Sequence, residues 1–196
     1  MKLEDQIVEV FNESYFIKNS FICNNVEKLI EVINKIIMTI KSGNKILIFG
    51  NGGSASDSQH MASEFVNRLK IDRSPLPAIS LTTDTSIITS IGNDYSFSEI
   101  FSRQVRAIGK PGDIAFGITT SGNSINIIKA FEEAKKIGLF TVCLTGNNGG
   151  KINDISDLSL IVSSNNTQRI QETHIMIIHI ICELVEKYFS EGYFKI

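Results

Sequence analysis

The sequence has few cysteines, no excess of one charge and no long apolar run, and each shortage excludes a class of protein. Its three cysteines, Cys23, Cys143 and Cys182, lie far apart and show no CxxC spacing. An odd, unpatterned set of this kind indicates a reducing compartment, and small apolar packing is the simplest role for each thiol. We therefore expect a cytoplasmic location.

Charge and hydropathy exclude two kinds of partner. The formal net charge is −2, and the Lys and Arg residues are scattered, so no basic stripe indicates nucleic-acid binding. No apolar run reaches the length that spans a membrane. The N-terminal MKLEDQIVEVF alternates charged and apolar residues, which is typical of an amphipathic helix and not of a signal peptide.

Length and composition predict one domain. The chain has 196 residues, of which 42% are apolar, and this is enough for a sizeable core. No internal repeat, low-complexity segment or long linker divides it. We expect a single domain over residues 1–196, with N-terminal helices over 1–43 and an α/β core over 44–196 that ends in a long helix.

Short apolar runs alternate with stretches of helical periodicity along the chain. Helical periodicity predicts helices at 3–22, 25–42, 54–69, 97–108, 123–137 and about 167–190. Continuous apolar runs predict strands at 45–49, 77–81, 113–118, 140–145 and 158–162. Such strands, separated by helices, indicate an α/β fold with a parallel sheet covered on both faces. Ligands bind sheets of this type beyond the carboxyl ends of the strands.

Two polar loops follow two of these strands. The first strand leads into GNGGSAS, with Asn51, Gly52 and Gly53, and the third leads into TTSGNS at 119–124. Helix N-termini with nearby hydroxyls suit a phosphate group, although Ser and Thr also cap helices routinely. Neither loop holds a Lys, so a P-loop is excluded. G-x-G-x-x-A at Gly50–Ala55 is a weak dinucleotide pattern.

Four polar side chains on two helices form a candidate reactive site. His60 and Glu64 are spaced i, i+4 and share a helix face, while Gln171 and His179 lie about 80° apart around the final helix. These groups are able to hold zinc, with Gln as an uncommon ligand, or to move protons, with Glu as base and His as acid. The simpler alternatives are an exposed helix pair for His60 and Glu64, and a core histidine for His179. His174 points elsewhere and is expected to be structural or to support the site.

Five segments in the right order resemble one family. They are GNGGSASDSQHMASE, SIGND, TTSGNS, LTGNNGG and RIQETHIMIIH. Together they resemble the phosphoheptose isomerases, within the sugar-isomerase (SIS) fold superfamily. The resemblance implies a three-layer α/β/α sandwich on a five-stranded parallel sheet, an N-terminal helical extension and a homotetramer. It also implies isomerisation of sedoheptulose 7-phosphate to D-glycero-D-manno-heptose 7-phosphate, which feeds lipopolysaccharide or capsule.

The same resemblance assigns roles to residues. It implies one divalent metal, commonly zinc, held by His60, Glu64, Gln171 and His179, with Glu64 as base and His179 as acid. The implied substrate-binding residues are Asn51, Gly52, Gly53, Glu64, Asn93, Asp94, Thr119, Thr120, Ser121, Ser124 and Gln171. The family loop often begins STS, and here it begins Thr119-Thr120-Ser121, which keeps the hydroxyl. A Glu that binds zinc tightly is a weaker base, so Glu64 need not play both roles at the same instant.

Two other functions remain open on the sequence alone. A non-catalytic sugar-phosphate sensor or adaptor would share the fold, but relatives of that kind often lose the Glu or the final His, and this chain keeps Glu64 and His179. A dinucleotide-dependent oxidoreductase would leave the second hydroxyl loop unexplained. The final helix has apolar residues around nearly its whole circumference, so we expect an outward side, with Ile178 on it, at a subunit contact.

Overall fold

A five-stranded parallel sheet forms the centre of the computed structural model, which describes residues 2–191. Its strands are β1 (Ile46–Gly50), β2 (Ala78–Ser80), β3 (Ile114–Thr119), β4 (Phe140–Gly146) and β5 (Leu158–Val162). The strand order is β2-β1-β3-β4-β5, and every neighbouring pair is parallel. The five predicted strands are therefore confirmed.

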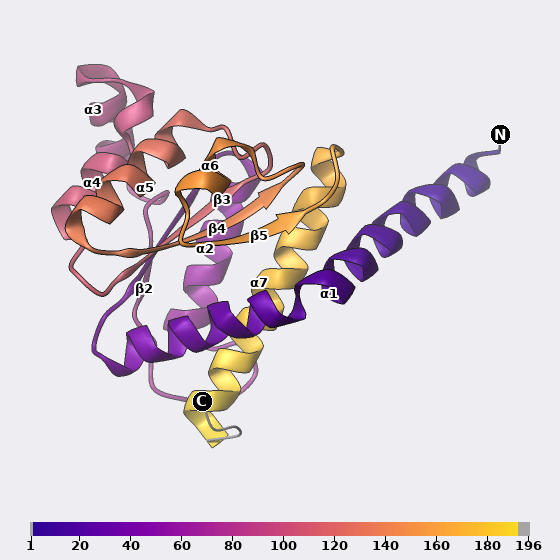
Figure 1. Cartoon of the computed structure of the whole chain (residues 1–196), viewed down its shortest axis with the longest axis horizontal. Helices are drawn as coiled ribbons and strands as arrows, with labels where there is room; N and C mark the ends of the chain where they lie inside the picture. The colour runs from indigo at the N-terminus through magenta and orange to yellow at the C-terminus, as the bar shows by residue number, and fades with distance from the viewer. Residues whose placement is uncertain (1, 192–196) are drawn as a thin grey trace.

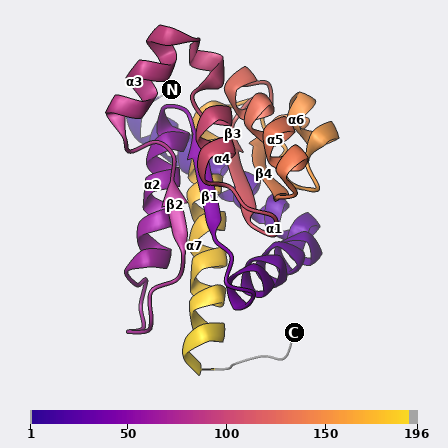
Figure 2. The same ribbon diagram turned by 90° about the vertical axis from the view of Figure 1, so that its left-hand side faces the viewer.

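Helices cover both faces of the sheet and give three layers (Figures 1 and 2). The helices are α1 (Leu3–Lys41), α2 (Gly53–Val66), α3 (Thr85–Asp94), the 3₁₀ turn η1 (Phe97–Glu99), α4 (Ser102–Ile108), α5 (Ile125–Ile137), α6 (Gly150–Ile155) and α7 (Thr167–Glu191). One apolar core joins the sheet to α1, α2 and α7, and a second joins it to α3, α4, α5 and α6. The predicted α/β/α sandwich is confirmed.

The N-terminal extension is one continuous helix, so the prediction of separate helices at 3–22 and 25–42 is wrong. No Gly or Pro lies within α1. The amide groups of Asn24 and Asn25, where a break was expected, donate to the carbonyl oxygens of Ser20 and Phe21 one turn earlier. The side chains therefore bond along the helix instead of ending it. The first half of α1 projects beyond the body of the molecule (Figure 1).

Two short helices were missed and one predicted helix is broken. Residues 97–108 form η1 and α4 rather than one helix. In α3 the sequence TSIITSIGND is rich in β-branched residues, which hides its helical character. Its start is nevertheless signalled by Asp84, whose carboxylate accepts a hydrogen bond from the Ile87 N–H as an N-cap. The six-residue α6 begins at the second of two glycines, Gly150, and is too short to show a period.

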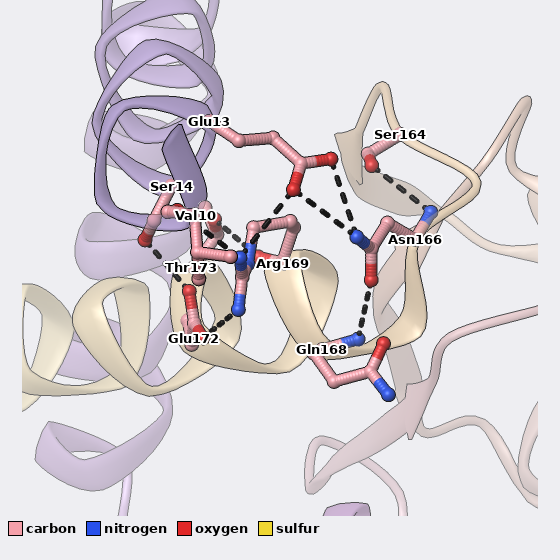
Figure 3. Close-up of polar contacts among 9 residues, drawn as sticks. All are labelled: Val10, Glu13, Ser14, Ser164, Asn166, Gln168, Arg169, Glu172 and Thr173. Atoms are coloured by element: carbon pink, nitrogen blue, oxygen red, sulfur yellow. Dashed lines mark hydrogen bonds and ion pairs between the residues drawn. The ribbon is translucent and has the colours of Figure 1, made fainter. Parts of the chain in front are cut away.

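Arg169 near the start of α7 fastens the first half of α1 to the body (Figure 3). Its guanidinium donates to the Val10 carbonyl and to the carboxylates of Glu13 and Glu172, and the Ser14 hydroxyl donates to Glu172. Arg169 is only 8% exposed, so these bonds compensate a largely desolvated charge. The contact places α1 beside the turn of α7 that carries Gln171.

The sheet and two helices of the same chain pack around α7, so more of its surface is buried within one subunit than we expected. This helix contacts α1, α2, β4 and β5, and Ile178 is fully buried in the core shared with α1 and α2. The expectation that Ile178 lies on an outward side is therefore wrong, because α1 and α2 of the same chain supply the second cover. Among residues 2–191, no helix has the length and apolar character that crossing a membrane requires.

Candidate active site

The first polar loop turns sharply from β1 into α2. Gly52 has φ +55° and ψ −122°, a conformation that favours glycine. Gly53 lies directly against the Gln171 side chain, and a Cβ on this glycine would overlap the Gln171 amide. The structure therefore brings Gly53 and Gln171 together at the start of α2.

The second polar loop turns from β3 into α5. The hydroxyl groups of Thr119 and Ser124 lie 3.2 Å apart, and the Ser121 hydroxyl accepts a hydrogen bond from the Asn123 N–H. Gly122, with φ +66°, packs so closely on the Gly149 carbonyl that a Cβ would overlap it. Thr120 is half-buried and Ser121 is exposed. Hydroxyls and the N-terminus of α5 thus face the same edge of the sheet, and this suits an anion.

His60, Glu64 and His179 meet where α2 faces α7. The Nε2 atoms of the two histidines are 3.2 Å apart, and His60 Nε2 is 3.2 Å from Glu64 Oε1. The two rings are edge to face, with centroids 5.0 Å apart. The histidines are exposed, whereas Glu64 is half-buried. His179 is therefore not a core histidine, and the His60–Glu64 pair is not an isolated surface pair.

The two 3.2 Å contacts of His60 Nε2 have the spacing expected of neighbouring ligands on one small cation. Zinc bonds of about 2.0–2.1 Å in a tetrahedron put neighbouring ligand atoms about 3.3 Å apart. Glu64 Oε2 is buried and has no hydrogen-bond partner within residues 2–191, which leaves an acceptor available. As the side chains stand, however, residues 2–191 contain no group of three or more His, Cys, Asp or Glu arranged to hold a metal. The contacts whose length fits such ligands are the two made by His60.

Asn93 and Asp94 are predicted site residues at the end of a helix away from α2 and α7. They end α3 and are exposed, and the Asn93 amide donates to the Asp94 carboxylate. The helix α3 begins at Thr85, shortly after the carboxyl end of β2 at Ser80, and the two residues lie at its far end. The hydrogen bonds of the described chain join neither residue to His60, Glu64 or His179.

His174 is buried behind the second loop. Its Nε2 lies 3.2 Å from the carbonyl of Thr145, the β4 residue that pairs with Thr119 of β3. Its Nδ1 has no hydrogen-bond partner among the residues that the structure describes. Burial lowers the pKa of His174 to about 4, against a smaller opposite effect of the Thr145 hydrogen bond. The ring is therefore neutral at pH 7 and supports the strand end beneath the loop.

Sequence reasoning missed the residue that holds the end of α2. The Arg73 guanidinium donates to the carbonyl oxygens of Glu64 and Phe65 in the last turn of that helix. Cations at a helix C-terminus stabilise it. Arg73 lies outside any motif and eight or nine residues from its acceptors, so only the tertiary structure reveals the contact.

Comparisons with known proteins identify the family of the chain. Residues 11–146 match the family described as the SIS domain. The phosphoheptose isomerase of Aquifex aeolicus is 50% identical over 187 residues, which are 95% of this chain and 98% of that protein. The chain belongs to the phosphoheptose isomerase family. It is therefore an isomerase with the SIS fold, and neither an oxidoreductase nor a non-catalytic regulator is favoured.

Solved structures of family members have the same fold. A phosphoheptose isomerase from Francisella tularensis superposes with a TM-score of 0.92 at 37% identity, over 95% of this chain and 100% of that one. The enzyme from Neisseria gonorrhoeae superposes with a TM-score of 0.89 at 40% identity and the same coverage. The α/β/α fold of this chain is therefore the fold of the family.

Proposed function

We propose that the chain interconverts D-sedoheptulose 7-phosphate and D-glycero-D-manno-heptose 7-phosphate. The observation that carries the proposal is the meeting of His60, Glu64 and His179 beside two glycine- and hydroxyl-rich loops, in a chain half identical to phosphoheptose isomerases. Ketose–aldose isomerisation needs one group to move a carbon-bound proton and another to serve the oxygens. A carboxylate and an imidazole at one place meet both needs.

Each group has a role in this reaction. Glu64 takes the proton from one of the two reacting carbons and returns it to the other through an enediol. His179, facing His60 across the site, moves the proton between the two oxygens. The phosphate binds at the loop of Thr119, Thr120, Ser121 and Ser124. It is remote from the reacting carbons, and its binding energy positions them.

The substrate's polar groups have further candidate ligands. Asn51, Gly52 and Gly53 line the first loop, and Gln171 lies against Gly53. Asn93 and Asp94 lie at the end of α3. The family resemblance supports these residues as ligands of the sugar hydroxyls.

Zinc belongs to the proposed site. The donor set His60, Glu64, Gln171 and His179 fits this ion in chemistry, and the two contacts of His60 fit it in spacing. A bound divalent cation polarises the carbonyl oxygen of the sugar. Glu64 would be one of the residues that hold the ion, and its Oε2, which has no hydrogen-bond partner among the described residues, leaves an acceptor on the same side chain.

The wider setting is also part of the proposal. We infer a cytoplasmic homotetramer that supplies heptose for lipopolysaccharide or capsule. The family resemblance supports this setting, and the projecting half of α1 supports assembly. Its side chains include exposed Leu3, Ile7, Val8, Val10, Phe11, Tyr15 and Phe16. An apolar surface of this extent is usual where protein subunits meet.

A direct assay tests the function. The protein, supplied with zinc, is incubated with sedoheptulose 7-phosphate, and the aldose is detected by NMR. We expect its anomeric signals to appear with turnover. If no aldose forms while the sugar phosphate still binds, the sensor alternative is supported. Absorbance of bound nicotinamide or flavin in the purified protein would support the oxidoreductase alternative instead.

A further inference from the structure

Two asparagine side chains join the two polar loops of the site. The Asn51 amide donates to Asn126 Oδ1 at 3.0 Å, and the Asn126 amide donates back to Asn51 Oδ1 at 2.8 Å. Asn51 follows β1, and Asn126 is the second residue of α5. Asn126 is only 4% exposed, whereas Asn51 is half-buried. The two side chains therefore bond reciprocally, with Asn126 in the interior and Asn51 at the site.

The pair lies at the point where the chain changes direction across the sheet. β1 and β3 are neighbours, with Gly50 beside Ile118, yet β1 leads to α2 on one face and β3 leads to α5 on the other. Such a point opens a crevice between the two loops, and ligands bind in it. The two amides bridge the loops at this point.

The contact with Asn126 uses only part of the hydrogen-bonding capacity of the Asn51 amide. An asparagine side chain has two N–H donors and an oxygen with two lone pairs. The pairing uses one donor and one lone pair of Asn51. The other donor and lone pair remain, in an orientation that Asn126 fixes. A sugar hydroxyl, which both donates and accepts, suits such a group.

We propose that Asn126 is a positioning residue for sugar-phosphate binding, acting through Asn51. This inference rests on the proposed function, since it concerns how the same site binds its substrate. An asparagine in the first turn of a helix ordinarily bonds to its own backbone. Here its donor and acceptor are both directed at the other loop. Without Asn126 the Asn51 amide would turn freely and lose the orientation that matches the substrate.

Steady-state kinetics of the zinc-supplied protein test the inference. Asn126→Ala should raise the KM for sedoheptulose 7-phosphate about 3- to 10-fold, the value of one or two neutral hydrogen bonds, while kcat changes less than about 2-fold. Asn51→Ala should do the same. The double variant should be no worse than the poorer single variant, because both changes remove one unit.

A matched control separates positioning from general stability. The Asn44 amide donates to the Pro111 carbonyl and to Asp113 Oδ1 at the opposite end of the sheet, so Asn44→Ala should lower Tm without changing KM. If Asn126→Ala does not fold, Asn126→Asp is the second variant. It keeps the shape of the side chain and still accepts the hydrogen bond from the Asn51 amide, but it cannot donate to Asn51 Oδ1, so its KM should still rise. An unchanged KM in a folded Asn126 variant, or KM effects that multiply in the double variant, would overturn the inference. An inactive native protein would instead overturn the proposed function itself.

Discussion

Arg73 and Glu186 form a buried pair that connects the two helices of the site. Arg73 Nε lies 3.7 Å from Glu186 Oε1, and their side chains are 4% and 1% exposed. Arg73 holds the last turn of α2 through the Glu64 carbonyl. Glu186, on α7, accepts hydrogen bonds from the backbone N–H groups of Leu69, Lys70 and Ile71. The relative position of α2 and α7 therefore depends on this pair.

Glu186→Ala should be strongly destabilising. The change leaves Arg73 buried without its counter-charge and three N–H groups without their acceptor, so the free energy of unfolding should fall by about 3–5 kcal/mol. Urea denaturation measures this. The control is Glu183→Ala on the same helix, which removes only exposed ion pairs with Lys70 and Lys187 and should cost about 1 kcal/mol or less. Equal losses in the two variants would contradict the role given to Glu186.

Stability should fall with acid because of His174. Burial lowers its pKa from 6.5 to about 4, so between these values the unfolded chain binds a proton that the folded chain does not. Its contribution is complete above pH 6.5 and is lost as the pH falls toward 4, by about 3 kcal/mol. His174→Gln keeps a donor for the Thr145 carbonyl and cannot titrate. Urea unfolding at pH 5 and pH 7.5 should differ less for this variant than for the native chain, and an equal difference would contradict the assignment.

Glu64→Gln should abolish the carbon proton transfer while keeping the shape of the site. Deuterium incorporation from solvent at C2 should fall by ~10²-fold or more, because an amide cannot accept the proton. NMR of the recovered sugar phosphate measures it. Substrate binding by calorimetry should persist, and near-normal exchange in this variant would show that another group is the base.

Metal content should follow the His60 and His179 side chains. Elemental analysis of protein purified without chelator should find about one divalent ion per subunit, most of it zinc. His60→Ala and His179→Ala should each lower this occupancy. Unchanged occupancy in both variants would place the ion elsewhere, whatever happens to activity.

A charge on the projecting half of α1 should separate the subunits. Phe11 and Phe16 are 68% and 65% exposed, and Phe16→Glu would bury an unpaired carboxylate if α1 packs against another copy. Light scattering should show a tetramer for the native chain and smaller species for the variant, with activity lowered. Ile178→Glu is the contrasting variant, since Ile178 is in the core and the change should unfold the subunit. A fully active native monomer would contradict the assembly.

The sheet was predictable because its strands are continuous apolar runs. The strands β1, β3, β4 and β5 are buried along nearly their whole length, whereas Ile79 in the middle of the short β2 is exposed. Continuous apolar runs between helices have one common arrangement. The helices were less predictable. Nothing local distinguishes a break at Asn24-Asn25 from the continuous α1, and α3 is stabilised by its cap rather than by its composition. The single domain over residues 1–196 stays a prediction.

The candidate site was predictable only within each element. The i, i+4 spacing placed His60 beside Glu64, and the structure has them 3.2 Å apart. His179 faces His60 because α2 packs on α7, and no local sequence pattern predicts this packing. For the same reason the sequence did not indicate Arg73 or Asn126. Their partners are brought to them by tertiary packing, so single-sequence patterns contain no signal for them. The roles of the predicted site residues stay predictions until they are tested.

The pairing of α1 with α7 has a consequence for synthesis. The apolar residues in the second half of α1, among them Val32, Ile36 and Ile37, are covered by β5 and α7, which are near the other end of the chain. A ribosome therefore releases the first helix well before the segments that cover it exist. During that interval its apolar side faces water, and exposed surface of this kind favours aggregation. The nascent chain should depend on chaperones until α7 has emerged.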